Sequence, residues 1–224
     1  MKKFFLTRIL FSFLLLTSSI VFCLKNTDNN FTIMIDPAGD AKNTGRQIDD
    51  TLERAVTLQF AQKLKSEIEN KFNNISVVLT RSSGDNVESL QNANFANRLD
   101  VDFYFNINFY KETAVKSQAY IYIFSYKDDF IAKKPDLYFY PYDAAHLINR
   151  ETTKKSANII KNTFLSGDNT KYFDFCGIFN LPFKPLIAIK APAIGIEIGL
   201  NNKHDWNNYI SIFLDIIDKL SKLN

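Results

Sequence analysis

Hydrophobic residues after residue 30 recur with two spacings, one typical of helices and one typical of buried strands. Between Leu52 and Phe72 an apolar residue returns every fourth position, which predicts a helix with one buried stripe. By contrast, Val77, Val78 and Leu79 follow one another without a polar break, as in a strand buried on both faces. The runs of strand type are residues 31–35, 75–79, 101–109, 120–124, 186–189 and 194–200, and those of helix type are residues 52–72, 87–99, 143–165 and 204–220.

Strands and helices alternate along this part of the chain, as in β-α-β units. The sequence therefore predicts an α/β fold with a single, mostly parallel twisted sheet of about six strands and helices on both faces. In such sheets ligands bind at the carboxyl ends of the strands. We expect one rim of the sheet to collect the polar residues that stand at these places, namely Asp36, Glu53, Asn108 and Glu197.

Glu197 and Glu53 differ in how strongly they indicate a site. Glu197 interrupts an otherwise apolar strand, where a carboxylate is costly unless it is paired or functional. We interpret it as a functional carboxylate, and a structural ion pair with a Lys or Arg of the rim is the alternative. Glu53 stands in the first turn of a predicted helix, where the helix dipole alone favours an acidic residue.

The first 23 residues form a segment of their own. Lys2, Lys3 and Arg8 precede an apolar run at residues 9–22, an order typical of a secretory signal rather than of a membrane-spanning helix. Cys23 follows this run and indicates a lipoprotein site, with an uncleaved anchor as the alternative. We predict a chain exported to the periplasm or cell envelope that touches the membrane only through its N-terminus, with a signal peptide, lipoprotein signal or anchor at 1–23, a linker at 24–30 and an α/β domain at 31–224.

The distribution of charge argues against nucleic acid as a partner. The chain has 27 Lys and Arg against 24 Asp and Glu, which gives a formal net charge of +3. The signal-like segment contains three of the basic residues and no acidic one, so the rest of the chain is formally neutral. A protein that binds nucleic acid usually carries a basic patch and a basic excess.

Six short motifs, in order, resemble those of the zinc-dependent N-acetylmuramoyl-L-alanine amidases. The first strand of that family ends in Asp-Pro-Gly-His-Gly-Gly, and here residues 35–41 read Ile-Asp-Pro-Ala-Gly-Asp-Ala. The last strand of the family carries Pro-Ala followed by Glu-x-Gly, as residues 192–199 do here. The resemblance implies an enzyme fold that cuts the amide between the peptidoglycan sugar and the stem peptide. The other four motifs match residues 52–58, 78–81, 96–97 and 106–110.

The family's zinc ligands are only partly present. The resemblance places the three ligands at Gly39, Glu53 and Asn108 and the general base at Glu197, so both histidine ligands are replaced. Hydrolytic zinc needs about three protein donors and an open position for water. Glycine offers no side chain, and an amide oxygen is a poor zinc ligand. We therefore predict a degenerate amidase that holds no cofactor and binds peptidoglycan or an envelope partner.

Two other interpretations stay open. Asp40 could replace the missing donor, so that Asp40, Glu53 and Asn108 hold Mg²⁺, Ca²⁺ or Mn²⁺ in an active amidase with Glu197 as general base. A metal-free mechanism with Glu53 and Glu197 as an acid–base pair is disfavoured, because it would leave the tetrahedral oxyanion of amide hydrolysis without its main stabiliser. The other alternative is a structural envelope protein with a closed cleft.

The candidate binding residues come from two parts of the sequence. Asp36 ends the first strand, and Arg81 ends a Leu-Thr-Arg motif that the family shares. Tyrosine rings with a polar tip suit a glycan or peptide groove, because they offer a large contact area with few rotors to freeze. A β-hairpin with a wet face is the alternative for these tyrosines. They are concentrated in one stretch, at Tyr120, Tyr122, Tyr126, Tyr138, Tyr140 and Tyr142, and we assign Tyr138 and Tyr140 to binding.

Overall fold

The structure is a computed structural model that describes residues 30–126 and 141–223. The predictions for the N-terminal segment, for Cys23 and for Tyr138 and Tyr140 fall outside these residues. Residues 31–224 form a compact unit of their own. Within the described part of the chain, no helix combines the length and the apolar character needed to cross a membrane.

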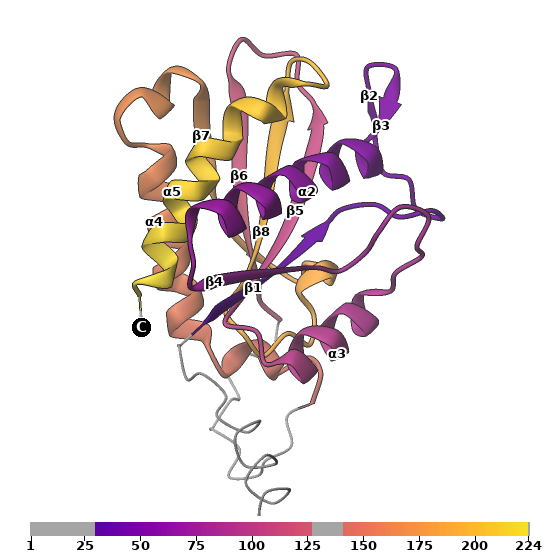
Figure 1. The fold of residues 1–224 in the computed structure, drawn as a ribbon, viewed down its shortest axis with the longest axis vertical. Helices are drawn as coiled ribbons and strands as arrows, with labels where there is room; N and C mark the ends of the chain where they lie inside the picture. Colours follow the sequence, from indigo (N-terminus) through magenta and orange to yellow (C-terminus); the bar gives the residue numbers. More distant parts are fainter. Residues whose placement is uncertain (1–29, 127–140, 224) are drawn as a thin grey trace, which may run out of the picture. The chain divides into compact units, whose positions relative to one another are not determined.

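A six-stranded sheet runs through the domain in the order β4-β1-β5-β8-β6-β7 (Figure 1). Every neighbouring pair is parallel except β6 and β8, which are antiparallel. The mostly parallel α/β sheet predicted from the sequence is therefore confirmed. Its strands are Phe31–Pro37 (β1), Ile75–Leu79 (β4), Phe103–Lys111 (β5), Ser117–Phe124 (β6), Phe173–Leu181 (β7) and Ala193–Leu200 (β8), and the short strands Gln47–Ile48 (β2) and Thr51–Leu52 (β3) pair with each other.

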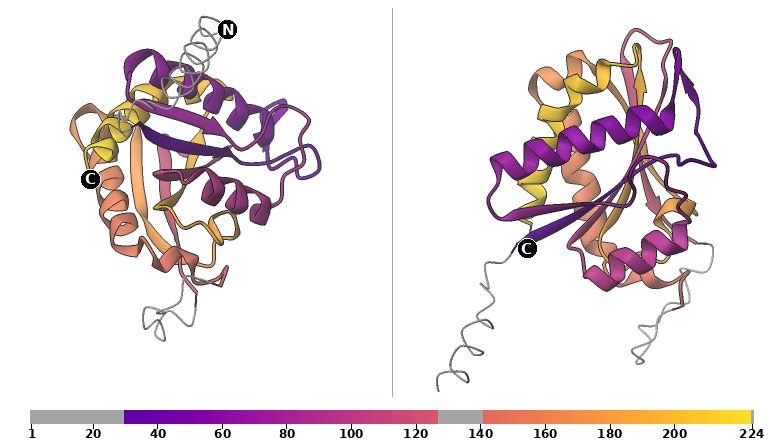
Figure 2. Two further views of the ribbon diagram at one scale, coloured as in Figure 1. Left: turned by 60° about the horizontal axis from the view of Figure 1, so that its bottom comes forward. Right: turned by 45° about the vertical axis from the view of Figure 1, so that its right-hand side comes forward.

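Helices cover both faces of the sheet, but unequally (Figure 2). Helices α2 (Glu53–Lys71), α4 (Arg150–Phe164) and α5 (Ile210–Ser221) pack on one face and bury the larger core. The other face is covered by α3 (Ser89–Leu99) and by the segment that contains a 3₁₀ turn at Lys184–Leu186. The remaining 3₁₀ turns lie at Ala145–Leu147, Gly167–Lys171 and Asp205–Tyr209.

The alternation of side chains along the strands separates the two faces. Ile194, Ile196 and Ile198 of β8 belong to the larger core, so Gly195 and Glu197 point to the opposite face. On that opposite face the smaller core gathers residues from the beginnings of β5 and β8 together with two alanines of α3. Toward the carboxyl ends of β5 and β8, this face is not covered by any helix of the described residues.

The prediction of a strand at residues 186–189 is wrong. Leu186 and Ile189 are buried because they pack against α3 in the smaller core, and burial alone gave this run the appearance of a strand. Pro185 sits in a 3₁₀ turn, and Ala188 has a positive φ of 65°, so the backbone is not extended there. The sixth strand of the sheet is instead β7, an edge strand with a bulge at Cys176.

The long helix predicted at residues 143–165 is also shorter than expected. A 3₁₀ turn occupies Ala145–Leu147, and the regular helix α4 begins at Arg150. The apolar stripe of α4 is the part that packs in the larger core, through Ala157, Ile160 and Phe164. The helical pattern of the sequence therefore located α4 correctly and placed its beginning too early.

Candidate functional site

Two carboxylates and one guanidinium meet near the carboxyl ends of β5 and β8. Glu53 opens α2, Glu197 lies in β8, and Arg46 precedes the short strand β2. Arg46 Nη2 lies 3.1 Å from Glu53 Oε1, and Arg46 Nη1 donates a hydrogen bond to Glu197 Oε1. The guanidinium therefore bridges the two acidic side chains that the sequence singled out.

Hydrogen bonds saturate the carboxylate of Glu53. Its Oε1 accepts from Arg46 Nη2 and from the backbone N–H of Phe109, both at 3.1 Å. Its Oε2 accepts from the backbone N–H of Arg46 at 3.1 Å and from Arg46 Nε at 3.2 Å. The side chain is only 6% exposed, so these bonds offset the desolvation of a buried charge.

Glu197 is held in a similar way from two sides. Its Oε1 accepts from Arg46, and its Oε2 accepts from the hydroxyl of Tyr122 at 2.5 Å. Burial and this bond to Glu197 raise the pKa of Tyr122 well above its usual value, so the hydroxyl stays protonated as a donor. For Arg46, burial lowers the pKa, but the bonds to Glu53 and Glu197 outweigh it and raise the pKa above its usual value. The guanidinium is therefore permanently charged.

A glycine allows the loop to reach Glu53. Gly45 has a φ of +74°, a conformation that other residues rarely adopt. A Cβ atom at Gly45 would lie 2.7 Å from Glu53 Oε2, which is closer than contact distance. Arg46 was not singled out from the sequence, and the one local indication of its role is its position between Gly45 and the acidic start of α2.

Asp40 is engaged in its own loop and not in this bridge. Its Oδ1 accepts from the backbone N–H groups of Lys42 at 2.8 Å and Asn43 at 2.5 Å. Its Oδ2 accepts from the Asn43 side chain and the backbone N–H of Val87, both at 3.3 Å. Burial alone would raise the pKa of Asp40, but these bonds outweigh it and hold the pKa below its usual value. Asp40 stabilises the loop as a carboxylate.

The structure leaves no room for a side chain at Gly39. A Cβ there would lie 2.8 Å from the Cβ and 3.1 Å from the Cα of Arg54 in α2. Gly39 also has a φ of +77°, so a substitution is strained whatever the space. The position that the resemblance assigns to a histidine ligand is therefore packed against α2.

Asn108 belongs to a hydrogen-bond network that begins at Asp36. Asn108 Nδ2 donates to Asn106 Oδ1 at 2.6 Å, and Asn106 Nδ2 donates to Asp36 Oδ2 at 2.8 Å. Thr80 and Asn92 donate to the other oxygen of Asp36 at 2.7 and 2.9 Å. Burial is the largest influence on Asp36 and raises its pKa, although these donors act in the opposite direction.

Arg81 links the end of β1 to the first turn of α2. Its Nε donates to the carbonyl oxygen of Pro37 at 2.9 Å, and its Nη2 donates to that of Arg54, also at 2.9 Å. Like Asp36, Arg81 is buried. Both nevertheless border an open cleft of about 230 Å³ at this end of the sheet, together with Gly39, Asp40 and Asn108. Their role in binding a ligand stays a prediction.

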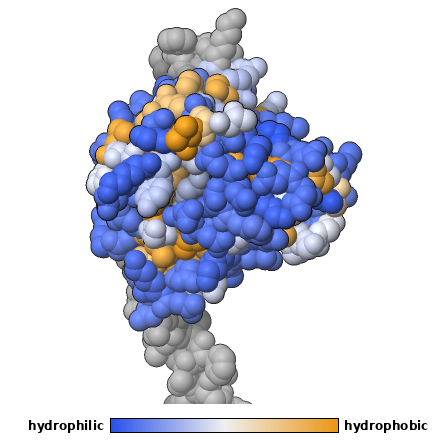
Figure 3. All heavy atoms as spheres, turned by 90° about the horizontal axis from the view of Figure 1, so that it is seen from above, coloured by the Kyte–Doolittle hydropathy of each residue, from blue (hydrophilic) through white to orange (hydrophobic). Residues whose placement is uncertain are grey.

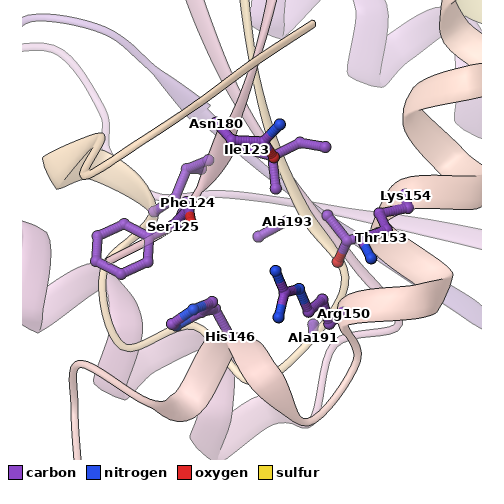
Figure 4. Close-up of a pocket in the computed structure, with 11 residues that line it drawn as sticks. Ile123, Phe124, Ser125, His146, Arg150, Thr153, Lys154, Asn180, Ala191 and Ala193 are labelled. Carbon is purple, nitrogen blue, oxygen red and sulfur yellow. The ribbon is translucent and has the colours of Figure 1, made fainter. Parts of the chain in front are cut away.

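The surface at the end of the sheet that holds this site consists mainly of hydrophilic residues (Figure 3). A separate pocket lies at the other end, where β6 ends and β8 begins (Figure 4). Phe124, His146 and Arg150 line it, but its volume of about 20 Å³ holds little more than one water molecule. Of these two hollows, the cleft beside Asn108 is the better candidate for a ligand larger than a water molecule.

The residues at the rim do not fit a hydrolytic zinc ion. Zinc prefers imidazole and thiolate ligands and needs an open coordination position. Gly39 has no side-chain donor, and Asn108 has only an amide group. Both oxygens of Glu53 already accept hydrogen bonds, which come from Arg46 and from the backbone of Phe109. In the part of the chain that the structure describes, no three His, Cys, Asp or Glu side chains are grouped to hold a metal.

Two curated relatives share sequence with part of the chain. N-acetylmuramoyl-L-alanine amidase CwlM of Bacillus licheniformis is 32% identical over 90 residues, which cover 40% of this chain and 36% of the relative. The sporulation-specific N-acetylmuramoyl-L-alanine amidase of Bacillus subtilis is 29% identical over 90 residues, or 40% of this chain and 35% of the relative. The matched region thus spans about a third of the length of these relatives.

Solved structures show the same fold over most of the chain. The catalytic domain of CwlV, an N-acetylmuramoyl-L-alanine amidase from Bacillus (Paenibacillus) polymyxa, has a TM-score of 0.64 and 19% identity, with 86% of this chain and 99% of that chain covered. CwlD amidase from Clostridioides difficile, solved in complex with the GerS lipoprotein, has a TM-score of 0.62 and 15% identity, with 87% and 100% covered.

The sequence model of one family spans most of the domain. The model of the family described as N-acetylmuramoyl-L-alanine amidase matches residues 33–211, from β1 to the first turn of α5. The match includes Glu53, Asn108 and Glu197, and it also includes Arg46, which bridges two of them. This chain belongs to the N-acetylmuramoyl-L-alanine amidase family.

Proposed function

We propose that this protein is a degenerate amidase of the cell envelope that binds peptidoglycan without hydrolysing it. The observation that carries the proposal is the guanidinium of Arg46, which bridges Glu53 and Glu197 where a hydrolytic site would need a metal and a free base. A guanidinium donates hydrogen bonds through a fixed set of N–H groups and offers no coordination position for water. Both carboxylates are therefore bound to one cation that supplies neither a Lewis acid nor a nucleophile.

An active enzyme with Asp40, Glu53 and Asn108 as ligands is less well supported. Asp40 is bonded to its own loop through both oxygens, and Glu53 is bonded to Arg46 and Phe109. Releasing both carboxylates would break eight hydrogen bonds that stabilise the rim. A structural protein with a closed cleft is disfavoured because a cleft of about 230 Å³ opens beside Asn108.

The same proposal includes an exported location. The charged and apolar order of residues 1–23 supports a secretory signal, and membership of the amidase family supports a cell-wall ligand. One structural neighbour, CwlD, is described in complex with a lipoprotein. We therefore include an envelope protein as a second class of binding partner, since such an interaction needs no hydrolysis.

The test combines metal content, hydrolysis and retention on cell walls. The full chain is purified without chelators, assayed for bound transition metals, and incubated with purified sacculi. We expect less than a tenth of an equivalent of metal, no release of stem peptide, and sedimentation of the protein with the sacculi. About one equivalent of metal together with release of stem peptide would overturn the proposal, and so would failure to sediment.

A further inference from the structure

Five aromatic side chains form a continuous patch on the open part of the sheet. We call the patch the aromatic platform, and it consists of Tyr110, Tyr120, Tyr122, Phe179 and Phe183. The ring centroids are 6.4 Å apart for Tyr110 and Tyr120, 6.1 Å for Tyr120 and Phe179, 6.1 Å for Tyr122 and Phe179, and 4.8 Å for Tyr122 and Phe183.

The platform lies on the second face of the sheet, opposite the larger core, in the part that no helix of the described residues covers. Phe109 of β5 and Ile121 of β6 are in the larger core, so Tyr110, Tyr120 and Tyr122 point away from it. None of the five platform residues is buried, and Phe179 of the edge strand is 41% exposed. Because these side chains come from β5, β6 and β7 and from the segment after β7, the patch extends across several strands.

Two glycines of β8 leave room for rings of the platform. A Cβ at Gly195 would lie 2.7 Å from the ring of Phe183, and a Cβ at Gly199 would lie 3.0 Å from the ring of Tyr110. The rings therefore lie over the backbone of β8, in space that any larger residue would fill. Glu197 stands between these glycines and presents a planar polar group beside the rings.

The charges around the platform argue against an acidic ligand. The Tyr110 hydroxyl donates to Glu112 at 2.7 Å, and Tyr122 donates to Glu197. Arg46 lies over the ring of Tyr110 at 5.4 Å, but it is already shared between Glu53 and Glu197. Three carboxylates against one guanidinium leave this region with an excess of negative charge, which repels the carboxylates of a stem peptide.

We propose that the aromatic platform binds the glycan strand of peptidoglycan, in its uncharged N-acetylated hexosamine units, and not the stem peptide. The C–H faces of a pyranose ring are apolar and fit the face of an aromatic ring, while hydroxyl and acetamido groups can bond to planar polar side chains at the edge. Tyr122 and Glu197 provide such groups beside the rings. This inference rests on the proposed function and names the part of the polymer that is recognised.

The probe is a chitin hexasaccharide, which offers N-acetylglucosamine units with no stem peptide. We expect calorimetric titration to detect binding to the full chain, and we expect Phe179→Ala and Tyr120→Ala each to weaken it about tenfold. Tyr172→Ala is the matched control, because Tyr172 is 58% exposed and lies outside the platform. Thermal unfolding of each variant verifies the fold, and Phe179→Ala is the safer of the two because that ring is already exposed.

The outcomes separate this inference from the proposed function. Retention on sacculi without binding of the hexasaccharide would overturn the glycan inference and leave the proposed function standing. Competition by a free stem peptide, or equal loss in Tyr172→Ala and Phe179→Ala, would overturn the glycan inference as well. Failure of both sacculi and hexasaccharide to bind would overturn both proposals.

Discussion

Replacing Arg46 by methionine tests whether the guanidinium holds the rim together. Methionine keeps the length of the apolar stem but removes the bonds to Glu53 and to Glu197. Two carboxylates then face each other without a cation, and Glu53 is only 6% exposed. Because the Arg46 backbone N–H and the Phe109 N–H still bond to Glu53, the helix start keeps part of its support.

The expected loss of stability lies between two known limits. Removing one partner of a fully buried ion pair costs about 3–5 kcal/mol, whereas an exposed pair contributes about 0–1 kcal/mol. The Arg46 side chain is 47% exposed and that of Glu197 is 17% exposed, so solvent screens part of the interaction. We expect the free energy of unfolding to fall by about 2–3 kcal/mol, which lowers the melting temperature by about 5–10 °C for a domain of this size.

The pH dependence identifies the cause of the loss. Without the guanidinium, the negative charges of Glu53 and Glu197 repel each other in the folded state. This repulsion is present at neutral pH and disappears in acid, where carboxyl groups lose their charge. The difference between wild type and Arg46→Met should therefore shrink from about pH 7 toward about pH 4.

Thermal unfolding followed by circular dichroism at several pH values measures both effects. Arg98→Met is the matched control, because Arg98 is an exposed residue of α3, and it should change stability by no more than about 0.5 kcal/mol. An Arg46→Met protein that melts with the wild type at neutral pH would refute the role of the bridge. A loss that is the same at all pH values would refute the electrostatic reasoning.

Three further predictions follow from single positions of the loop and network. Gly45→Ala should lower the free energy of unfolding by about 2–4 kcal/mol, as measured by chemical denaturation, because the new methyl group meets Glu53. Gly84→Ala is the control: Gly84 also has a positive φ of +88° but nothing within 4 Å of an added Cβ, so the loss should be only about 1–2 kcal/mol. Because burial raises the pKa of Asp36, the stability advantage of wild type over Asp36→Asn should decrease as the pH rises, and an advantage that increases with pH would contradict this. The double variant Gly39→His with Asn108→His should bind no zinc by metal analysis and release no stem peptide while Arg46 remains, because a side chain at Gly39 meets α2.

The sequence predicted the parts of the fold that depend on local pattern. The strand at β1, the strand at β4 and the helix α2 follow from apolar periodicity, and the structure places each within a few residues of its predicted range. The edge strand β7 was missed because only one of its edges is paired and several of its residues are exposed, which weakens the apolar pattern. The segment 186–189 misled for the opposite reason, since it is buried by α3 without being a strand.

The candidate site was predictable only in part, because its central contact joins distant parts of the chain. Glu53 and Glu197 could be singled out, one as a helix start and one as a charge within an apolar strand. Arg46 lies 151 positions before Glu197, and no local pattern indicates that the two side chains meet. An ion pair between Glu197 and a basic residue of the rim was the alternative interpretation from the sequence, and the structure assigns that residue.

A guanidinium and a metal ion can both balance the charge of carboxylates, but they support different chemistry. Arg46 brings one positive charge and five N–H groups in a fixed plane, which suits two carboxylates on neighbouring elements. A metal ion would also polarise a bound carbonyl and lower the pKa of a bound water, because its coordination sphere has an open position. The bridge therefore holds α2 against β5 and β8, and under the proposed function it does so without supplying the Lewis acid or the nucleophile of a hydrolytic step. The proposed binding at the cleft and at the aromatic platform depends only on this arrangement of elements, so the proposal requires no catalysis.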